Sequence, residues 1–474
     1  MSQYQTVRES KRGRRASIQP LKPLANLPHD LLENVFSFLP IREAIEASMV
    51  STRFKKSWHL NRKFNFGKDF SLRFSREDLI AVVDGLFNSH RGEHIQTFQL
   101  QIDPLGAEEF LDKWLEICIQ KGIEELDLYF FQSGYSLSAD FVDNLKALRT
   151  LKLVHCDFQL PPVMNSMRFL STLVLWQLNL TEDKLDTLIR YCKLLATLDL
   201  FRCSGIRHAS ICASSHRFFK LLKITCCSDL RGIMVEAPSL RSIFYYGHIP
   251  TIKFGSRVAL HEAFFNFEPS GYRTYLQAPL LEQLTSDICN VTLLSTSALL
   301  PEGLTARHRG SDFREADYCF LNLREFQLFM EGGLFCNPYD IIMFIKHCPK
   351  LEKLFIDLND YNLECGAYWE LHQKPRLEKL HHYFNKLRVV KLNGFKFLRS
   401  ELELVKILLQ RAISLELLVL VTPKNGRTKL RSQDAPKYNL LFLTWKASPA
   451  TKIVLYEHFN DKSCITPSHP KSWF

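Results

Sequence analysis

The 474-residue sequence has no long hydrophobic run. Polar or charged residues interrupt each apolar segment before the roughly 18 residues that a membrane span needs. The first residues, MSQYQTVRES, contain no apolar core, so we expect no secretory signal. Paired cysteines are also missing, because the 13 Cys are odd in number, scattered and without C-x-x-C spacing. This usage is typical of reduced thiols, so we expect a protein of the nucleus or cytoplasm with no membrane contact.

Sequence motifs of common active sites are absent as well. The sequence contains no nucleophile elbow, P-loop, dinucleotide-binding glycine pattern or H-E-x-x-H. The 16 His are dispersed, and we interpret them as surface side chains rather than metal ligands. We therefore expect a chain that is not an enzyme and that needs no metal or cofactor.

The composition is that of a folded protein, with 46% hydrophobic and 23% charged residues. The net charge of +11 includes five basic residues and one acid within residues 1–15. The remaining excess is diffuse, so it is weak evidence for a nucleic-acid partner. Residues 1–23 are predicted to be a disordered basic tail. Their basic run is either a nuclear localisation signal or a solvated tail without a receptor, and the sequence leaves both open.

Residues 24–62 carry more apolar surface than so short a segment can bury. Leu, Val and Phe recur there at three- and four-residue spacing, which predicts a helix that ends before Pro40. A second helix is expected over 41–50 and a third from about residue 52. One interpretation is a helical hairpin inside a larger core. The other, which we favour, is a helix cluster that docks on another protein.

The order of residues in this segment resembles an F-box. The similarity lies in Leu-Pro at 27–28, Asp-Leu-Leu at 30–32, VFSFLP at 35–40, SMVS at 48–51, and an aromatic at 54. Phe54 departs from the Trp that is most common in the family, but it keeps most of the packing volume. The resemblance implies binding to the Skp adaptor of a cullin-based SCF ubiquitin ligase. The adaptor-binding residues that it implies are Leu27, Pro28, Leu31, Leu32, Val35, Phe36, Leu39, Pro40, Val50, Phe54 and Trp58.

An apolar-x-x-apolar-x-apolar pattern then repeats along the chain. It begins at residues 95, 123, 148, 170, 195, 219 and 240, more weakly at 260 and 281, and clearly again at 323, 351, 387 and 415. The first intervals of 20 to 28 residues lie in the range of leucine-rich repeats. Each pattern predicts a short strand with inward leucines, and stacked strands form a solenoid over 63–386. The wider later spacing implies a hidden turn and insertions, and 299–312 is expected to be an irregular loop.

Three cysteines follow their strand patterns at one fixed distance. Cys156, Cys203 and Cys227 each lie three residues beyond the last apolar residue, at the position that caps the turn in leucine-rich repeats. Zinc binding is the poorer interpretation, because these cysteines belong to different turns.

Residues beside the inward leucines should face the concave side of the solenoid. Aromatic side chains often anchor protein interfaces, so we predict that the aromatics among them bind a target protein. The alternative is that they only pack on neighbouring strands. The predicted target-binding residues are Tyr129, Trp176, Phe201, Tyr246 and Phe329.

The last part of the chain resembles the FBD module of plant F-box proteins. The resemblance rests on LRVVKLNGF at 387–395, ELELV at 401–405, LELLV at 415–419 and the Ala-Ser-Pro that precedes Ile453 and Val454. Physically, this region predicts a strand–helix–strand unit that covers the apolar end of the solenoid. We expect the cap to span 387–458 and residues 459–474 to form a loose tail.

Together these features predict an α/β protein with an F-box, a leucine-rich-repeat solenoid and an FBD-type cap. The family resemblance implies a substrate-recognition subunit of an SCF-type ligase, which binds the Skp adaptor and an unknown protein target. A non-degradative scaffold is one alternative. A receptor for a small anionic ligand or nucleic acid is another, which the modest basic excess supports.

Overall fold

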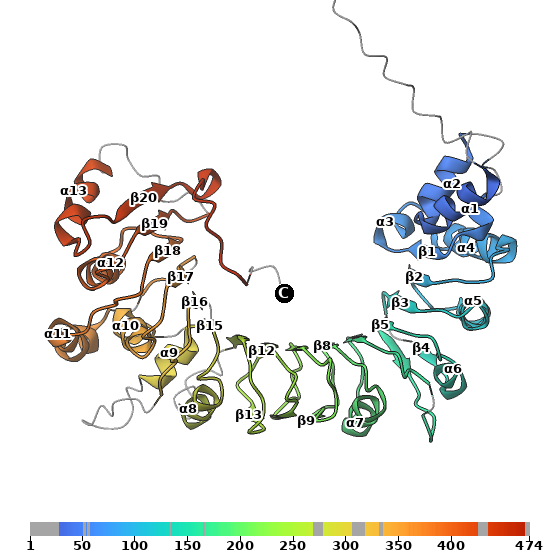
Figure 1. Cartoon of the computed structure of the whole chain (residues 1–474), viewed down its shortest axis with the longest axis horizontal. Coiled ribbons are helices and arrows are strands. Elements are labelled where there is room, and N and C mark those ends of the chain that lie inside the picture. Colours follow the sequence, from blue (N-terminus) through green and yellow to red (C-terminus); the bar gives the residue numbers. More distant parts are fainter. Residues whose placement is uncertain are drawn as a thin grey trace, which may run out of the picture. The chain divides into compact units, whose positions relative to one another are not determined.

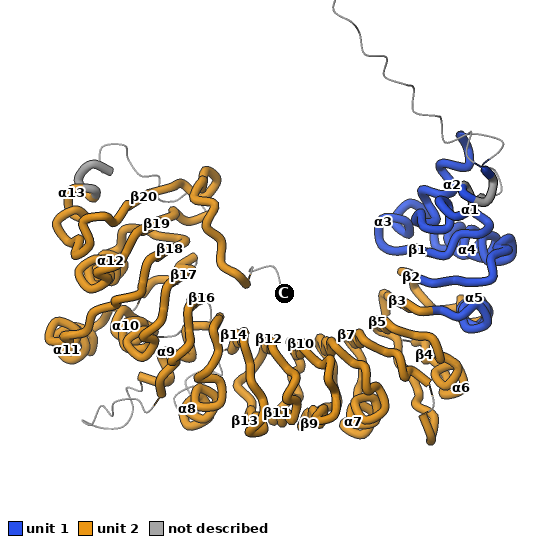
Figure 2. The backbone as a smooth tube through the Cα atoms, viewed as in Figure 1, with its two compact units in different colours: residues 1–100, 110–123 blue, residues 101–109, 124–474 orange. Residues whose placement is uncertain are grey.

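The structure is a computed structural model that describes residues 28–50, 54, 57–132, 134–164, 166–268, 278–305, 318–330, 335–359, 361–363, 365–424 and 435–469. The predicted basic tail therefore lies outside the described residues. The chain divides into two compact units, shown in Figure 2. Unit 1 comprises 1–100 and 110–123, and unit 2 comprises 101–109 and 124–474.

Unit 1 begins with the short helices of the F-box segment. Helix α1 (His29–Phe38) and helix α2 (Ile41–Ser48) each follow a proline, and Pro40 ends α1 because it cannot continue a helix. Of the third predicted helix, the structure describes a 3-10 turn, η2 (Ser57–Leu60).

The three F-box elements enclose a small core of their own. It consists of Phe36, Ala44 and Phe54, against which Leu39, Ala47 and Trp58 pack. The rings of Phe36 and Phe54 lie 5.4 Å apart.

The rest of unit 1 is a strand–helix layer with an aromatic core. Strand β1 (Lys63–Phe66) pairs in parallel with β2 (Thr97–Ile102), and α3 (Lys68–Ser71), α4 (Arg76–Ser89) and α5 (Glu108–Gln120) complete the layer. The Ser75 side chain accepts a hydrogen bond from the Asp78 amide and caps α4. The buried aromatics that fill the core are Phe64, Phe66, Phe87, Phe98 and Trp114.

Asn61 ties the F-box helices to this layer. Its fully buried side chain donates to the carbonyl oxygens of Phe36 (2.9 Å) and Leu39 (2.6 Å) and accepts from the Lys63 amide (2.6 Å). The last carbonyls of a helix have no partner within the helix, so Asn61 supplies partners at the end of α1. It thereby fixes how α1 meets strand β1.

Unit 2 is built on one sheet of parallel strands, as the repeat pattern predicts. Figure 1 shows the strands along one side of this unit and helices along the other. The apolar residues at every second position of a strand point into the layer between sheet and helices. Burial of each Leu side chain there contributes about 1.5–3 kcal/mol to the free energy of unfolding. In sheet order, the strands are β3 (Glu125–Phe130), β5 (Thr150–Val154), β7 (Thr172–Trp176), β8 (Thr197–Phe201), β10 (Leu221–Thr225), β12 (Ser242–Gly247), β14 (Glu262–Phe267), β15 (Leu293–Ser297), β16 (Glu325–Phe329), β17 (Lys353–Asp357), β18 (Val389–Asn393), β19 (Leu417–Val421) and β20 (Lys452–Tyr456).

The chain leaves several of these strands through the same backbone turn. His155, Gln177, Arg202 and Cys226 directly follow β5, β7, β8 and β10, and all four have φ between 49° and 57°. The amide of each donates to a backbone carbonyl oxygen at the end of the next strand, with N···O distances of 2.7–3.1 Å. The acceptors are Trp176, Phe201, Thr225 and Tyr246, in that order. This left-handed residue redirects the chain while keeping the ladder of hydrogen bonds intact.

The outer face of unit 2 changes along the chain. Short strands replace helices where the repeats are shortest, because 20 to 24 residues leave little room for a helix. These strands form a parallel sheet of β13 (Thr251–Phe254), β11 (Gly232–Glu236) and β9 (His208–Cys212), and the shorter pair β4 (Tyr135–Leu137) and β6 (Cys156–Phe158) precedes them. The outer helices are α6 (Ala139–Asp143), α7 (Glu182–Tyr191), α8 (Ala278–Asp287), α9 (Leu299–Leu304), α10 (Pro338–Lys346), α11 (Lys374–Lys379), α12 (Arg399–Arg411) and α13 (Ala435–Trp445).

Two expectations within the solenoid are wrong. The weak repeat at residue 281 is part of helix α8, and the strand of that turn is β15, the hidden turn that the spacing implied. Leu281 and Leu284 are both buried in α8, since a three-residue spacing serves a helix face as well as the strand pattern. Residues 299–304 form α9 instead of an irregular loop, and 306–317 lie outside the described residues.

The C-terminal cap contains the predicted strand–helix–strand unit β18–α12–β19. Leu404, Val405, Leu408 and Leu409 of α12 are buried. The structure adds a second helix, α13, and a further strand, β20.

Candidate binding surfaces

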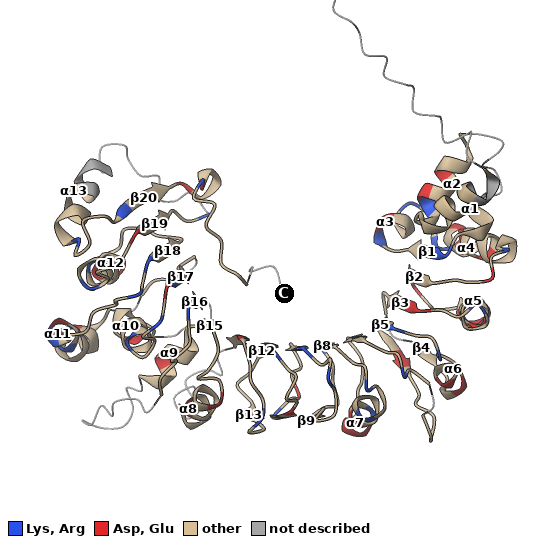
Figure 3. Cartoon of the chain, in the orientation of Figure 1, with Lys and Arg blue, Asp and Glu red and all other residues tan. Residues whose placement is uncertain are grey.

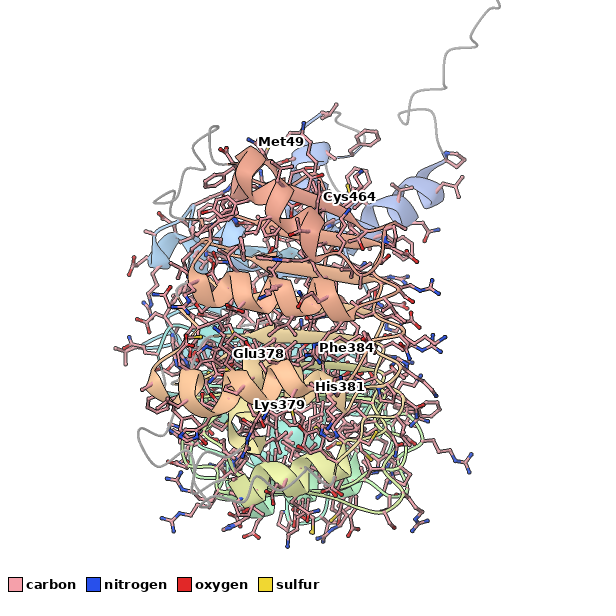
Figure 4. The ribbon with its side chains drawn as sticks, turned by 90° about the vertical axis from the view of Figure 1, so that its left-hand side faces the viewer. Met49, Glu378, Lys379, His381, Phe384 and Cys464 are labelled. Atoms are coloured by element: carbon pink, nitrogen blue, oxygen red, sulfur yellow. The ribbon has the colours of Figure 1, made fainter. Side chains whose placement is uncertain are left out.

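Helix α1 is apolar on two faces. Phe36 and Leu39 point into the F-box core, whereas Leu31, Val35 and Phe38 remain 50%, 42% and 59% exposed. At the end of α2, Met49 and Val50 are also exposed, and Met49 is labelled in Figure 4. The exposed apolar side chains of α1 lie on a helix whose other apolar side chains already pack a core, so this outer face is a candidate docking surface. We call Leu31, Val35, Phe38, Met49 and Val50 the F-box patch.

The predicted adaptor-binding residues divide into three groups. Pro28, Leu31, Val35, Pro40 and Val50 are exposed. Phe36 and Phe54 are buried in the F-box core, and Leu39 and Trp58 pack against it half-buried. Leu27 and the side chain of Leu32 lie outside the described residues.

The prediction did not include Phe38 and Met49. Both belong to the exposed patch. The three- and four-residue spacing of apolar residues predicts a helix, but it does not show which of two apolar faces is buried.

The sheet of unit 2 presents three rows of side chains on the face opposite the helices, which we call the inner face. The strand registers align the central residues of neighbouring strands into one row that crosses the sheet. From β3 to β18, this central row consists of Asp127, Lys152, Val174, Asp199, Lys223, Phe244, Phe264, Ser295, Gln327, Phe355 and Lys391.

Opposite charges alternate along the inner face. Lys152 lies 3.7 Å from Asp127, and Lys223 lies 3.9 Å from Asp199. Burial raises the pKa of Asp199, and the nearby Lys223 ammonium opposes that shift. Figure 3 shows both signs of charge along unit 2 rather than a single basic stripe.

Four of the five predicted target-binding aromatics are half-exposed on the inner face. Trp176 and Phe201 contact each other with ring centroids 5.5 Å apart, and the Trp176 indole donates to Asp199 (3.2 Å). Tyr129 instead packs edge-on against Phe131, and Tyr246 lines a small cavity between Arg202 and Glu268. The fifth aromatic, Phe329, is buried in a cluster with Phe244 and Phe264.

The C-terminal tail is not loose where the structure describes it. Residues 461–469 follow the 3-10 turn η5 (His458–Asn460) and lie on the inner face. Asp461 pairs with Lys391 on β18, Ser468 with Glu325 on β16, and His469 with Ser295 on β15. The prediction of a loose tail over 459–474 is therefore wrong for these residues, because its polar side chains have partners that belong to distant turns.

Comparisons with known proteins match these two regions separately. The F-box domain family matches residues 24–66, and the family described as "At1g61320/AtMIF1, LRR domain" matches residues 86–440. The chain is 31% identical over 446 residues to a putative FBD-associated F-box protein, At1g61330, of Arabidopsis thaliana, covering 92% of this chain and 99% of the relative. A second Arabidopsis thaliana protein, the FBD-associated F-box protein At1g61320, is 29% identical over 447 residues, with coverage of 92% and 97%.

This chain belongs to the plant F-box/FBD/leucine-rich-repeat family. A further Arabidopsis thaliana relative, an F-box/FBD/LRR-repeat protein (At1g13570), is 23% identical over 408 residues and covers 83% of this chain. The predicted fold class, with an N-terminal F-box followed by leucine-rich repeats, is confirmed.

Seven of the 13 cysteines of this F-box/leucine-rich-repeat protein are buried, where they act as small core and turn residues. All 13 are described and are free thiols. Cys203 donates to the carbonyl oxygens of Leu175 (3.1 Å) and Phe201 (3.7 Å), and Cys227 donates to that of Thr225 (3.6 Å). Burial raises the pKa of Cys192 to about 12, which keeps that thiol protonated at neutral pH.

Two other kinds of site find no support in the described part of this family member. Among those residues, no group of three or more His, Cys, Asp or Glu side chains is arranged to hold a metal ion. None of the described helices combines the length and apolar character needed to cross a bilayer.

Proposed function

We propose that this protein is the substrate-recognition subunit of an SCF-type ubiquitin ligase. F-box proteins with leucine-rich repeats generally have that role. In this proposal, the F-box docks on a Skp-type adaptor and, through it, on a cullin scaffold, while the inner face of the repeats holds a target protein. Other subunits catalyse ubiquitin transfer, and this chain contributes proximity between target and loaded enzyme.

The observation that carries the proposal is the F-box patch on α1 and α2. Its five apolar side chains are exposed although the opposite face of α1 already packs the F-box core. Covering such a patch by a partner would remove apolar surface from water at about 25 cal/mol per Å². Phe36 and Phe54 then support docking indirectly, by holding α1 and α2 in place.

The proposal is tested by adaptor binding of a surface variant. Leu31→Arg places a charge in the centre of the patch and should weaken binding to a purified Skp adaptor at least about tenfold, or 1.4 kcal/mol. A pull-down or calorimetry with the full chain measures this change. The matched control is Leu72→Arg, because Leu72 is a 69% exposed leucine of the same unit outside the patch. Equal binding by the Leu31→Arg chain would contradict the docking surface.

The target side of the proposal rests on the half-exposed aromatics of the inner face. Trp176 and Phe201 form a contacting pair of this kind, with Asp199 and Lys223 beside them. This mixture of rings and paired charges suits a protein partner, because rigid aromatic side chains are common anchors in protein interfaces.

A folded chain that binds a target but no adaptor would instead be a non-degradative scaffold. The free thiols agree with a location in the nucleus or cytoplasm.

A further inference from the structure

The C-terminal tail crosses the inner face as an extended segment. It leaves β20 and runs back along unit 2 (Figure 1). Its side chains contact β18, β16 and β15 and the rings of Phe264 on β14 and Phe244 on β12. Its order along the sheet is therefore opposite to the order of the strands. A segment that touches so many turns resembles a bound peptide more than a connecting loop.

One end of the tail neutralises a buried lysine. The Lys391 side chain is 5% exposed, and its ammonium donates to Asp461 Oδ2 (2.5 Å), Ser463 Oγ (3.0 Å) and the Ile465 carbonyl oxygen (2.7 Å). An ammonium group has three protons, and each of them has a partner in the tail. Lys391 is thus satisfied by a segment that begins 70 residues later in the sequence.

Ser468, which directly precedes the far end of the described tail, binds a carboxylate of the sheet. Both oxygens of Glu325 accept from Ser468, one from the backbone amide (2.7 Å) and one from the hydroxyl (2.9 Å). Lys353 lies 3.7 Å from the same carboxylate. Almost any peptide can supply the backbone amide, and a Ser, Thr or Tyr side chain can supply the hydroxyl.

The far end of the tail packs the His469 ring against two phenylalanine rings of the sheet. The His469 side chain is 3% exposed, and its ring lies edge-on to Phe244 (5.1 Å) and Phe264 (5.9 Å). Its Nδ1 lies 2.7 Å from the Ser295 hydroxyl. Phe244 and Phe264 share their cluster with Phe329, one of the predicted target-binding aromatics, so the tail contacts the cluster to which that residue belongs.

The tail does not fill this surface completely. A cavity of about 530 Å³ lies between the sheet and the tail, lined by Phe329, Phe355, Asp357, Asn393 and the tail residues 466–468, among others. Gln327 also lines it and is 2% exposed, and its Oε1 finds no hydrogen-bond partner among the described residues. A buried acceptor without a partner is unfavourable, because it has lost its hydrogen bonds to water. A ligand that filled the cavity with a donor group would therefore make contacts that the tail lacks.

We propose that the inner face from β12 to β18 is a binding site for an extended peptide segment of the target, and that residues 461–469 occupy it as an internal competitor. The displacing segment carries a carboxylate for Lys391, a donor for Glu325 and an aromatic or imidazole ring for Phe244 and Phe264. A side chain with an N–H or O–H between the first two of these groups, where tail residues 466–468 line the cavity, reaches Gln327. The proposal deepens the proposed function, on which it rests for the existence of a target.

Competition by a tethered segment follows from effective concentration. A tail joined to its own site by a short linker is present there at an effective concentration in the millimolar range. A free peptide with the same contacts therefore binds the intact chain weakly, and it binds more tightly once the tail is weakened. This difference is measurable without knowing the target.

The test uses a fluorescent peptide of residues 458–469 and two full-length chains. In the second chain, Asp461→Asn and His469→Ala weaken the attached tail. Fluorescence anisotropy should show at least tenfold tighter binding of the peptide to this double variant than to the wild-type chain. A peptide with the same two substitutions is the matched control and should bind the double variant at least tenfold less tightly than the unsubstituted peptide.

Hydrogen exchange of residues 461–469 decides what the attached tail does in each chain. The proposal expects slow exchange in the wild type and fast exchange in the double variant. Continued protection in the variant would show that Asp461 and His469 do not hold the tail, and the proposal would be wrong. A released tail without tighter peptide binding would equally overturn it.

A second variant keeps the test decisive if the double variant does not fold. Ser468→Pro removes the backbone N–H that donates a hydrogen bond to Glu325, and it leaves Lys391, Asp461 and His469 unchanged. It too should bind the peptide more tightly than the wild type, and unchanged binding by a folded Ser468→Pro chain overturns the proposal. The Leu31→Arg chain should bind the peptide as the wild type does, so failure of adaptor docking and failure of this site are distinguishable.

Discussion

His90 shows how a single buried residue couples two parts of unit 1. Its Nδ1 accepts a hydrogen bond from the Lys121 ammonium (2.9 Å), so its Nε2 carries the proton and donates to the Asn61 carbonyl oxygen (2.9 Å). The ring also packs edge-on against Phe64 (5.1 Å). Because Asn61 in turn caps α1, this neutral imidazole supports the placement of the F-box helices on strand β1.

The neutral state of His90 predicts a pH dependence of stability. Burial is the main reason that the pKa of His90 is lowered to about 4, and the charges of Lys121 and His59 lower it further. The hydrogen bond to Asn61 acts in the opposite direction and raises the pKa. In the unfolded chain the pKa is about 6.5, so the unfolded state binds more protons below that value. The free energy of unfolding should fall as the pH drops from about 6.5 towards 4, by at most about 1.4 kcal/mol per pH unit from this residue.

Urea unfolding at several pH values measures this effect. The comparison chain is His90→Gln, which keeps a hydrogen-bonding side chain but cannot take up a proton. Its unfolding free energy should depend less on pH between 6.5 and 4 than that of the wild type. Identical pH profiles would mean that His90 has an ordinary pKa in the folded chain.

At the scale of the element, the strand exits of unit 2 determine how the repeats stack. Gln177 has φ of 57°, and its amide donates to the Phe201 carbonyl oxygen (2.7 Å) on the next strand. The left-handed conformation is unfavourable for a residue with a Cβ by about 1–2 kcal/mol. The ladder of amides from strand to strand therefore holds these residues in a conformation that they would not adopt alone.

This strain predicts opposite effects of two substitutions at Gln177. Gln177→Gly should raise the free energy of unfolding by up to about 1 kcal/mol, because glycine adopts positive φ freely. Gln177→Val should lower it by about 1–2 kcal/mol, because a β-branched residue is especially disfavoured there. Chemical denaturation of both variants against the wild type tests the pair. Destabilisation by glycine as large as that by valine would show that the Gln177 side chain, rather than its backbone, matters.

At the scale of the whole molecule, the positive net charge does not gather on the inner face. Lys152, Lys223, Lys353 and Lys391 each lie within 4 Å of a carboxylate of that surface or of the tail. The cavity beside the tail includes Asp357 in its wall. These pairs favour a protein segment over the alternative of a small anionic ligand or nucleic acid.

The charge distribution predicts weak and non-specific nucleic-acid binding. At about 150 mM salt, a generic duplex should bind with a Kd of about 10 μM or weaker, in the range of non-specific contacts. Fluorescence anisotropy at two salt concentrations measures this. A chain without residues 1–23 is the informative comparison, because the basic run should supply most of the salt-dependent affinity. Tight binding that persists in the shortened chain would favour a nucleic-acid receptor.

Local patterns in the sequence were enough for the repeating elements and for the F-box. Leu residues three apart indicate a helix face, and Leu residues two apart indicate a strand face. Both patterns involve only residues that are close together in the sequence. The fold class, the helix that ends before Pro40 and the parallel strands at most of the repeat positions all follow from such spacing. The same reasoning failed at Leu281, where helix and strand patterns coincide over a few residues.

What the sequence by itself determined is therefore the kind and order of the elements, because these depend on short-range contacts. Only the tertiary structure decided which apolar face of α1 stays exposed and which residues cover the inner face. Lys391 and Asp461 are 70 residues apart in sequence, and Ser295 and His469 are 174 apart. No local pattern links such residues, since their meeting depends on the stacking of all the turns between them. The polar tail thus looked like a loose end, although each polar group that holds it has a partner on the folded sheet.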